Sequence, residues 1–264
     1  MADLSQDNPT GRFSGLANVY ARCRPTYPAS AIELIVSRGR LGPESLLVDV
    51  GCGTGISSRL FAQRDIPVIG IEPNPDMLRQ AELEPAAPGT LMPQYREGRA
   101  ECTGLPNEIA NIVLSAQAFH WFDADAALRE FHRLLKPDGW AALMWNERDE
   151  SDPFTRAYGD VVRTLPAAAA VEGPRARAGD PLLTHPWYQD RERLEFPNEQ
   201  TLDEDGLLGR TFSGSWAPKE PAAAEAFAAR VREAFGRFQT NGQVVMRYVT
   251  SLYLGRIRHP ANSL

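Results

Sequence analysis

The sequence contains little cysteine: three residues in 264, at Cys23, Cys52 and Cys102, with no CxxC pair among them. An odd number of widely spaced thiols argues against a disulfide framework and against a cysteine zinc site, so we expect no metal and a reducing, cytoplasmic location. The chain also lacks the run of roughly 18 apolar residues that a membrane span needs. Its first residues, MADLSQDNPTGRF, lack the basic start and apolar core of a signal peptide.

Positive charge is in deficit. The chain has 28 lysines and arginines against 34 aspartates and glutamates, a formal net charge of −6. Such a balance disfavours a surface that coats nucleic acid. The remaining composition, 43% hydrophobic and 23% charged, is typical of a globular protein. We therefore expect a small-molecule partner, with no nucleic acid and no membrane; the composition leaves the oligomeric state open.

Strand and helix patterns alternate through the first half of the chain. Buried strands are predicted at 45–50, 67–72, 112–117 and 140–145, and helices at 30–37, 56–63, 75–82 and 124–135. Asn74 and Asp123 can cap two of these helices, and KPDG at 136–139 predicts a turn. This alternation predicts an α/β fold: a Rossmann-like, doubly wound, mostly parallel sheet with helices on both faces.

The alternation ends after Asn146. Residues 165–190 are rich in alanine, proline, glycine and arginine and are predicted to be an irregular insertion. Two further strands are expected at 191–196 and 244–254, with an alanine-rich helix at 222–238 between them.

Three glycines follow the first predicted strand at alternate positions, in VDVGCGTG at 48–55. In an open parallel sheet, ligands bind beyond the carboxyl ends of the strands, and glycine lets a ligand lie against bare backbone. A dinucleotide fingerprint would need a further glycine where this chain has Ile56, which argues against NAD.

Glu72 ends the second predicted strand, 72 − 51 = 21 residues after the first glycine. Taken alone it could be a solvated glutamate at a strand end. At this spacing, however, a carboxylate can accept hydrogen bonds from both hydroxyls of a ribose. The glycine turn and Glu72 together favour an adenosine-bearing ligand that needs no phosphate.

Four motifs resemble those of the class I S-adenosylmethionine-dependent methyltransferases and occur in the right order: VDVGCGTG, IGIEPNPDML at 69–78, GRAECTGLP at 98–106 and LLKPDGW at 134–140. Two more, YARCRPTYP at 20–28 and QAFHWFD at 117–123, are similar to a small-molecule branch that includes trans-aconitate methyltransferases. The resemblance covers roughly 13–145 and is loose beyond Asn146. It implies the class I methyltransferase type of fold, S-adenosylmethionine as cofactor and S-adenosylhomocysteine as product.

This resemblance implies three parts and a set of cofactor contacts. Residues 1–40 would be an arm and first helix over the cofactor site, 41–147 the cofactor-binding core, and 148–264 a substrate cap with the last strands of the same sheet. Glu72 would hold the ribose, Asp49 would orient the amino group, and Gln117 would lie near the sulfonium. Arg24 would pair with the cofactor carboxylate, unless it is a surface arginine of the arm. The implied cofactor-binding residues are Tyr20, Arg24, Asp49, Gly51, Cys52, Gly53, Thr54, Gly55, Glu72, Pro73, Met77, Ala100, Glu101 and Gln117.

Methyl transfer from a sulfonium needs alignment and exclusion of water, and it needs a general base only when the acceptor is a hydroxyl or a protonated amine. His120 is the candidate base, unless AFHWF is an aromatic wall. The predicted acceptor-binding residues are Trp121, Trp145 and Arg148. The Cys52 thiol is not expected to act as a nucleophile.

The acceptor itself is predicted to be small. The fourth strand region, LSAQAF at 114–119, lacks the NPPY or DPPY type of motif used to methylate DNA amines and glutamine amides. Five arginines, at 148, 175, 177, 191 and 193, favour an anionic acceptor, unless they are solvated and reflect composition bias. His185 would reach the acceptor if the insertion forms a lid. A non-catalytic module that binds the cofactor remains an alternative, and an NAD-dependent oxidoreductase is a weaker one.

Overall fold

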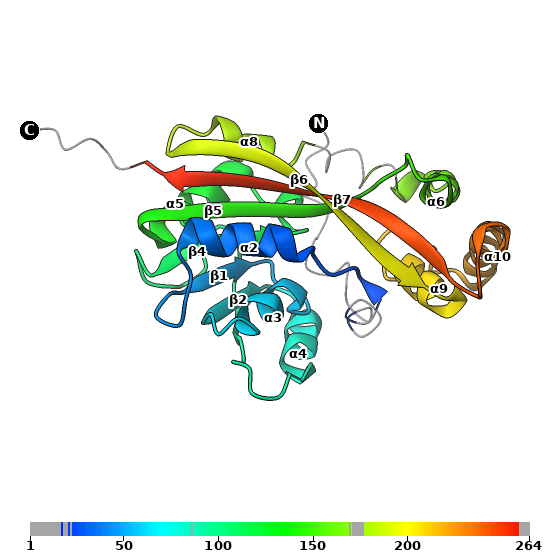
Figure 1. Ribbon diagram of the computed structural model, residues 1–264, viewed down its shortest axis with the longest axis horizontal. Helices are drawn as coiled ribbons and strands as arrows, with labels where there is room; N and C mark the ends of the chain where they lie inside the picture. Colours follow the sequence, from blue (N-terminus) through cyan, green and yellow to red (C-terminus); the bar gives the residue numbers. More distant parts are fainter. Residues whose placement is uncertain are drawn as a thin grey trace, which may run out of the picture.

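One sheet of seven strands organises the residues that the computed structural model describes, which are 17, 21, 23–85, 87–168, 170 and 177–258 (Figure 1). The strand order is β3-β2-β1-β4-β5-β7-β6. All neighbours are parallel except β7, which runs antiparallel to both β5 and β6. The predicted Rossmann-like sheet is confirmed. The strands are β1 (Leu47–Val50), β2 (Val68–Glu72), β3 (Gln94–Glu97), β4 (Ala110–Ala116), β5 (Leu135–Arg148), β6 (Tyr188–Leu202) and β7 (Val244–Ile257).

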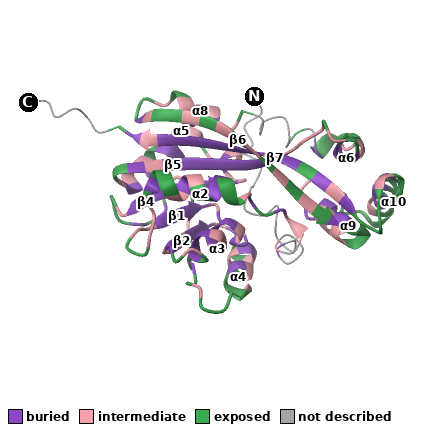
Figure 2. Ribbon diagram, in the orientation of Figure 1, coloured by how far each residue is buried: buried purple, intermediate pink, exposed green. Residues whose placement is uncertain are grey.

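Helices cover both faces of this sheet. The assigned helices are α2 (Ala29–Gly39), α3 (Ile56–Ala62), α4 (Pro75–Leu83), η2 (Phe119–Trp121), α5 (Ala124–Leu134), α6 (Pro153–Arg163), α8 (Asp180–Thr184), α9 (Glu204–Phe212) and α10 (Pro221–Phe238). Because side chains alternate along a strand, Leu47 packs with α2 and α3, whereas Val48 and Val50 pack with α5. The central strands are accordingly buried on both sides (Figure 2).

Two predicted helix caps are confirmed. Asn74 accepts hydrogen bonds from the backbone N–H groups of Asp76 and Met77 at the start of α4. Asp123 accepts one from Ala126 at the start of α5. Each cap fixes the point where the chain leaves a strand end and turns back into a helix, and these turns border the site described below.

The KPDG segment is not a separate turn but a bulge inside β5. Pairing with β4 jumps from Ala110 opposite Leu135 to Ile112 opposite Trp140, and Asp138 has a φ of 64°. The last two strands are also longer than predicted. Five elements, β3, η2, α6, α8 and α9, had no predicted counterpart, and α8 lies within the segment expected to be irregular.

A cap forms where the antiparallel pair of strands β6 and β7 continues past the end of β5. The β5–β7 pairing stops at Arg148 opposite Tyr248, whereas the β6–β7 pairing runs on to Leu202 opposite Val244. Helices α6, α9 and α10 gather around this extension (Figure 1) and share a hydrophobic core with it. We refer to α6, α9, α10 and the extension as the cap.

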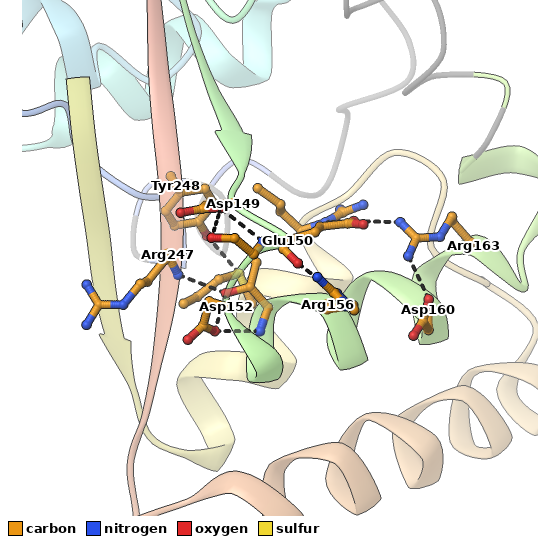
Figure 3. Close-up of polar contacts among 12 residues, drawn as sticks. Asp149, Glu150, Asp152, Arg156, Asp160, Arg163, Arg247 and Tyr248 are labelled. Atoms are coloured by element: carbon orange, nitrogen blue, oxygen red, sulfur yellow. Dashed lines mark hydrogen bonds and ion pairs between the residues drawn. The ribbon is translucent and has the colours of Figure 1, made fainter. Parts of the chain in front are cut away.

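A polar network fixes the corner where β5 leads into the cap (Figure 3). Asp152 accepts a hydrogen bond from Thr155 N–H and so caps α6, while the N–H of Asp149 donates to the carbonyl of Arg247 on β7, at 3.0 Å. Arg163 donates to Glu150 at 2.5 Å. The cap therefore leaves the sheet at a defined angle. No helix within the described ranges is long and apolar enough to cross a bilayer.

Candidate functional site

The glycine turn after β1 forms the floor of an open pocket at the carboxyl ends of the strands. Gly51 and Gly53 have φ of 71° and 56°, a left-handed backbone that favours glycine. A Cβ on Gly51 would lie 2.6 Å from the Cβ of Ala118, whereas a Cβ on Gly53 would point into open space. The turn is thus packed tightly at its start and leaves bare backbone toward a ligand at Gly53.

The empty space of this pocket, which we call the main pocket, is about 890 Å³ with the open solvent at its mouth included. Eighteen described residues line the main pocket. They are Tyr27, Gly51, Cys52, Gly53, Thr54, Ile56, Ser57, Glu72, Pro73, Met77, Arg99, Ala100, Glu101, Ala116, Gln117, Ala118, Trp121 and Phe122. Most of the expected cofactor contacts are therefore brought together, from the ends of four neighbouring strands.

Glu72 is held at the end of β2 by two backbone donors. Its carboxylate accepts from Gly53 N–H and from Asn74 N–H, both at 2.9 Å. Burial raises the pKa of Glu72 to about 7, although these two hydrogen bonds act in the opposite direction and nearby Asp49 adds to the rise. The carboxylate is therefore desolvated and poised for further donors such as ribose hydroxyls.

Asp49 lies beneath the turn and does not line the main pocket. The hydroxyls of Ser57 and Ser58 both donate to its Oδ2 at 2.6 Å, and burial raises its pKa to about 6. Within the described part of the chain, its Oδ1 and the Oγ1 of pocket-lining Thr54 are buried with no hydrogen-bond partner. Buried polar atoms of this kind usually have a partner. Thr54 lines the main pocket, so its hydroxyl is placed to bond a ligand there, whereas Asp49 does not line that space.

Apolar side chains also line the main pocket. Met77, which is 3% exposed, Pro73 and Ala100 are among them. Glu101, another lining residue, accepts a hydrogen bond from the N–H of Asp123 at 3.1 Å, which ties the pocket to the start of α5. The pocket therefore combines apolar surface with a few polar groups, as small-molecule sites do.

Gln117 stands at the end of β4 with a left-handed backbone, φ 60°. A non-glycine residue in this region is uncommon, and such strain gathers at functional sites. Its Nε2 lies 3.5 Å from the carbonyl oxygen of Asn146, at the end of β5. Gln117 lines the main pocket and also lines a second space that adjoins it.

This adjoining space, which we call the side cavity, encloses about 320 Å³ with open solvent included. Its described lining is Arg24, Pro25, Tyr27, Ile56, Gln117, Asn146 and Arg210. Tyr27, Ile56 and Gln117 line both spaces and so form their junction. Arg24 and Arg210 line the side cavity but not the main pocket. Arg24 therefore does not lie at the main pocket, where the resemblance had placed it.

Three predicted residues lie away from both spaces. The Trp145 side chain is 1% exposed in the core and donates from Nε1 to Nδ1 of His120 at 3.3 Å. His120 itself lines neither space. Arg148 lies 3.6 Å from Glu150 and over the ring of Tyr158. Neither Trp145 nor Arg148 therefore belongs to the described lining of either space, because both side chains are packed within the protein.

The other predicted cations do not gather at the site either. Arg191 and Arg193 lie on the outer strand β6, where Arg193 pairs with Glu195. His185 packs against α5, with its Nε2 at 3.4 Å from Asp125, so it belongs to no lid. Arg177 is exposed and lines neither space. Tyr20 and Arg175 lie outside the described residues.

Several lining residues were not predicted from the sequence. Tyr27 and Pro25 lie in the YARCRPTYP motif and could have been taken from it. Arg99 and Phe122 likewise lie within the motifs at 98–106 and 117–123. Arg210 had no signal, because only the packing of α9 brings it to the side cavity. Burial and the charges of Asp49 and Glu72 raise the pKa of the Cys52 thiol, which keeps it protonated and unreactive. Among the described residues, no three metal-ligating side chains gather.

The family model described as "Methyltransferase domain" matches residues 48–143. An uncharacterised methyltransferase of Mycobacterium tuberculosis is 33% identical over 216 residues, which cover 80% of this chain and 79% of that protein. A malonyl-[acyl-carrier protein] O-methyltransferase of Serratia marcescens is 30% identical over 143 residues, 52% of this chain and 54% of its own. A solved structure from Anaeromyxobacter dehalogenans, provisionally described as a type II methyltransferase, has the same fold: its TM-score is 0.60 at 24% identity, covering 89% of this chain and 97% of that one.

Proposed function

Because the chain belongs to the class I S-adenosylmethionine-dependent methyltransferases, we propose that it methylates a small, carboxylate-bearing molecule held in the side cavity. The observation that carries this proposal is the pair of arginines, Arg24 and Arg210, that line a space sharing Gln117 with the main pocket. S-adenosylmethionine is the cofactor.

The main pocket would hold the cofactor. Glu72 would accept from the ribose hydroxyls, Gly53 would leave room beside the methionine part, and Thr54 would offer its hydroxyl to the same part. Met77 and Pro73 would pack on the adenine. When bound, S-adenosylmethionine supplies an activated methyl group on a sulfonium.

The side cavity would hold the acceptor by its charge. An arginine can offer two parallel N–H donors to one carboxylate, and such charge-assisted bonds are roughly twice as strong as neutral ones. Arg24 also donates from Nη2 to the carbonyl of Ser213 at 2.9 Å, which fixes the guanidinium to the end of α9. A carboxylate seated between Arg24 and Arg210 would stand beside Gln117, next to the main pocket.

No proton needs to be removed from such an acceptor. A carboxylate is ionised at neutral pH, so methylation of its oxygen requires alignment and exclusion of water, without a general base. The titratable residues among the described lining of the side cavity are Arg24, Tyr27 and Arg210, none of which suits a base near neutral pH. Nδ1 of His120 already accepts the indole N–H of Trp145, so its neutral ring carries a proton on Nε2.

Two likenesses support an acidic acceptor. The N-terminal motif is similar to that of a branch that includes trans-aconitate methyltransferases. The Serratia marcescens relative is named as a malonyl-[acyl-carrier protein] O-methyltransferase.

A methyl-transfer screen tests the proposal. The protein is incubated with S-adenosylmethionine labelled in its methyl group and with matched panels of carboxylic acids, phenols and amines. We expect base-labile label, as in a methyl ester, from members of the acid panel only. Turnover restricted to neutral phenols or to amines would refute a carboxylate acceptor while leaving the methyltransferase assignment intact.

A further inference from the structure

One face of β6 changes character along its length. Glu192 pairs with Arg38 at the end of α2, at 2.7 Å, and Leu194 and Phe196 pack against the core beneath α2. Asn198 and Gln200 continue the same face, since alternate residues of a strand point the same way. They lie beyond the start of α2, beside residues 23–27 that lead into this helix.

Three side-chain amides donate to the backbone of residues 23–27. Asn198 Nδ2 donates to the carbonyl of Thr26 at 2.8 Å, and Asn146 Nδ2 donates to the same oxygen at 3.0 Å. Gln200 Nε2 donates to the carbonyl of Cys23 at 3.0 Å. This segment pairs with no strand, so side chains supply the donors for these two carbonyls. We call Asn146, Asn198 and Gln200 the amide clamp.

The clamp is itself held in place. Asn146 Oδ1 accepts from the Thr250 hydroxyl at 2.6 Å and from Asn198 Nδ2 at 3.1 Å. Asn146 is 7% exposed and Thr250 is fully buried, so the amide cannot rotate without breaking buried hydrogen bonds. On β6, the Gln200 Oε1 lies 3.4 Å from the hydroxyl of Tyr248. The orientation of the donors is therefore set by β5, β6 and β7.

The clamped segment carries three residues of the site. Arg24 and Pro25 line the side cavity, and Tyr27 lines its junction with the main pocket. Arg24 and Tyr27 differ in how they are anchored. Tyr27 is packed in the core with Ile32 and Ile35 of α2, whereas the Arg24 backbone lies between the two clamped carbonyls, those of Cys23 and Thr26.

We propose that Asn198 and Gln200 are positioning residues for acceptor binding: through the carbonyls of Thr26 and Cys23 they hold Arg24 in the side cavity. Neither touches the main pocket, so cofactor binding depends on them little. This inference rests on the proposed function in placing the acceptor at Arg24. The geometry of the clamp does not depend on which acceptor is used.

Two variants test the clamp. The first is the double variant Asn198→Ala with Gln200→Ala. The second is Asn198→Asp, which keeps the shape of the side chain and removes the N–H donor that Thr26 accepts. The matched control is Gln189→Ala on the same strand, because Gln189 Nε2 donates to the carbonyl of Ile257 at 3.5 Å, far from the clamp.

Labelling of Arg24 by phenylglyoxal, read by peptide mass spectrometry against the exposed Arg129, reports its position without any acceptor. In both clamp variants we expect Arg24 to react at least about threefold faster than in the wild type, with S-adenosylhomocysteine affinity within threefold of it. With the acid that the screen identifies, the acceptor KM should rise about tenfold or more and kcat should change less. The control should change none of these.

Contrary outcomes are distinct. Unchanged Arg24 labelling in both variants would overturn the clamp. The clamp would also be overturned if Asn198→Asp kept the wild-type labelling rate and acceptor KM while the double variant changed both. Loss of side-chain packing alone would then explain the effect of the double variant. Loss of S-adenosylhomocysteine binding together with a lower Tm in both variants would show a general folding role instead. If the wild type methylates no acid, the proposed function fails, and the labelling still decides whether the clamp holds Arg24.

Discussion

Glu72 should titrate in the folded protein near neutral pH, and the substitution Glu72→Gln tests this directly. Its carboxylate is 8% exposed, and burial raises its pKa from 4.5 to about 7. Protons therefore bind more tightly to the folded state than to the unfolded state. The contribution of Glu72 to the free energy of unfolding should rise as pH falls through 7 and level off near 4.5.

The magnitude follows from the shift. Between pH 7 and pH 5.5 the folded protein holds this proton and the unfolded chain does not, so wild type gains 1.5 pH units × 1.36, or about 2 kcal/mol. Glu72→Gln cannot take up this proton. Asp49, whose pKa is also raised, titrates in both proteins. Its contribution to the free energy of unfolding therefore largely cancels when the two proteins are compared.

Urea unfolding of the two cofactor-free proteins at pH 8.5 and pH 5.5 measures the effect. The free energy of unfolding of the wild type relative to Glu72→Gln should be about 2 kcal/mol higher at pH 5.5 than at pH 8.5. A difference that stays constant to within about 0.5 kcal/mol would mean that Glu72 is ionised throughout, and the reasoning from burial would be wrong.

Cofactor binding should show the opposite dependence on pH. Ribose hydroxyls donate to an ionised carboxylate, so binding at pH 5.5 must first remove the proton. With a pKa of about 7, the affinity of the wild type should fall about 30-fold between pH 8.5 and pH 5.5. Calorimetry on Glu72→Gln, which should bind more weakly and lack this dependence, corrects for titration of the ligand. If the affinity of the wild type does not fall at low pH, the carboxylate of Glu72 does not bind the ribose.

Three further outcomes are expected. Arg210→Gln should raise the acceptor KM about tenfold or more, since charge-assisted hydrogen bonds contribute roughly 1.5–3 kcal/mol, and should leave S-adenosylhomocysteine affinity unchanged in calorimetry; equal losses in both would place Arg210 in a general structural role. His120→Ala should retain kcat within about threefold in the methylation assay, whereas loss of a true general base would lower it about 100-fold or more. Thr54→Val removes a buried hydroxyl with no partner among the described residues. Cofactor affinity should therefore fall about tenfold, while the free energy of unfolding of the cofactor-free protein in urea should be unchanged or up to about 1 kcal/mol higher. An unaltered affinity would show that this hydroxyl does not bind the cofactor.

The cofactor side of the molecule could be predicted from the sequence because its determinants are local. The glycine turn follows its strand directly, Glu72 ends the next strand, and Asn74 caps the helix that follows. Each is a short-range pattern with a physical meaning, and a parallel sheet brings the ends of its strands to one edge. The strand order then needs no further information to assemble these residues.

Some elements were missed although their signals are present. The start of α6 has Asp152 followed by Pro153, a cap and a first-turn proline, and then Phe154, Tyr158 and Val162 at helical spacing. Strand β3 is different. Its sequence, QYRE, has three polar residues in four and is mostly exposed, and it is a strand because β2 offers a free edge for pairing. No hydrophobic periodicity in the sequence indicates this strand.

The acceptor side could not be predicted because distant segments build it. Arg24, Asn146 and Arg210 line one cavity, although the first and last are 210 − 24 = 186 residues apart. Arginines close to the strand ends in sequence, such as Arg148, turn into packing instead. The left-handed backbone of Gln117 is likewise imposed by its surroundings, since nothing in the residue type favours it.

Separate hydrophobic cores for the sheet and for the cap explain why the two sides differ in this way. The main pocket rests on the cores of the sheet, which hold β1, β2 and β4 between α2, α3 and α5. The cap has its own core, and α9, which carries Arg210, packs there. Changes within the cap can therefore shift Arg210 without disturbing Glu72 or the glycine turn. The amide clamp spans the boundary between these cores, because it joins the arm at Thr26 to β6, which extends into the cap. Acceptor binding should thus respond to changes in the clamp and the cap, and cofactor binding to changes in the sheet.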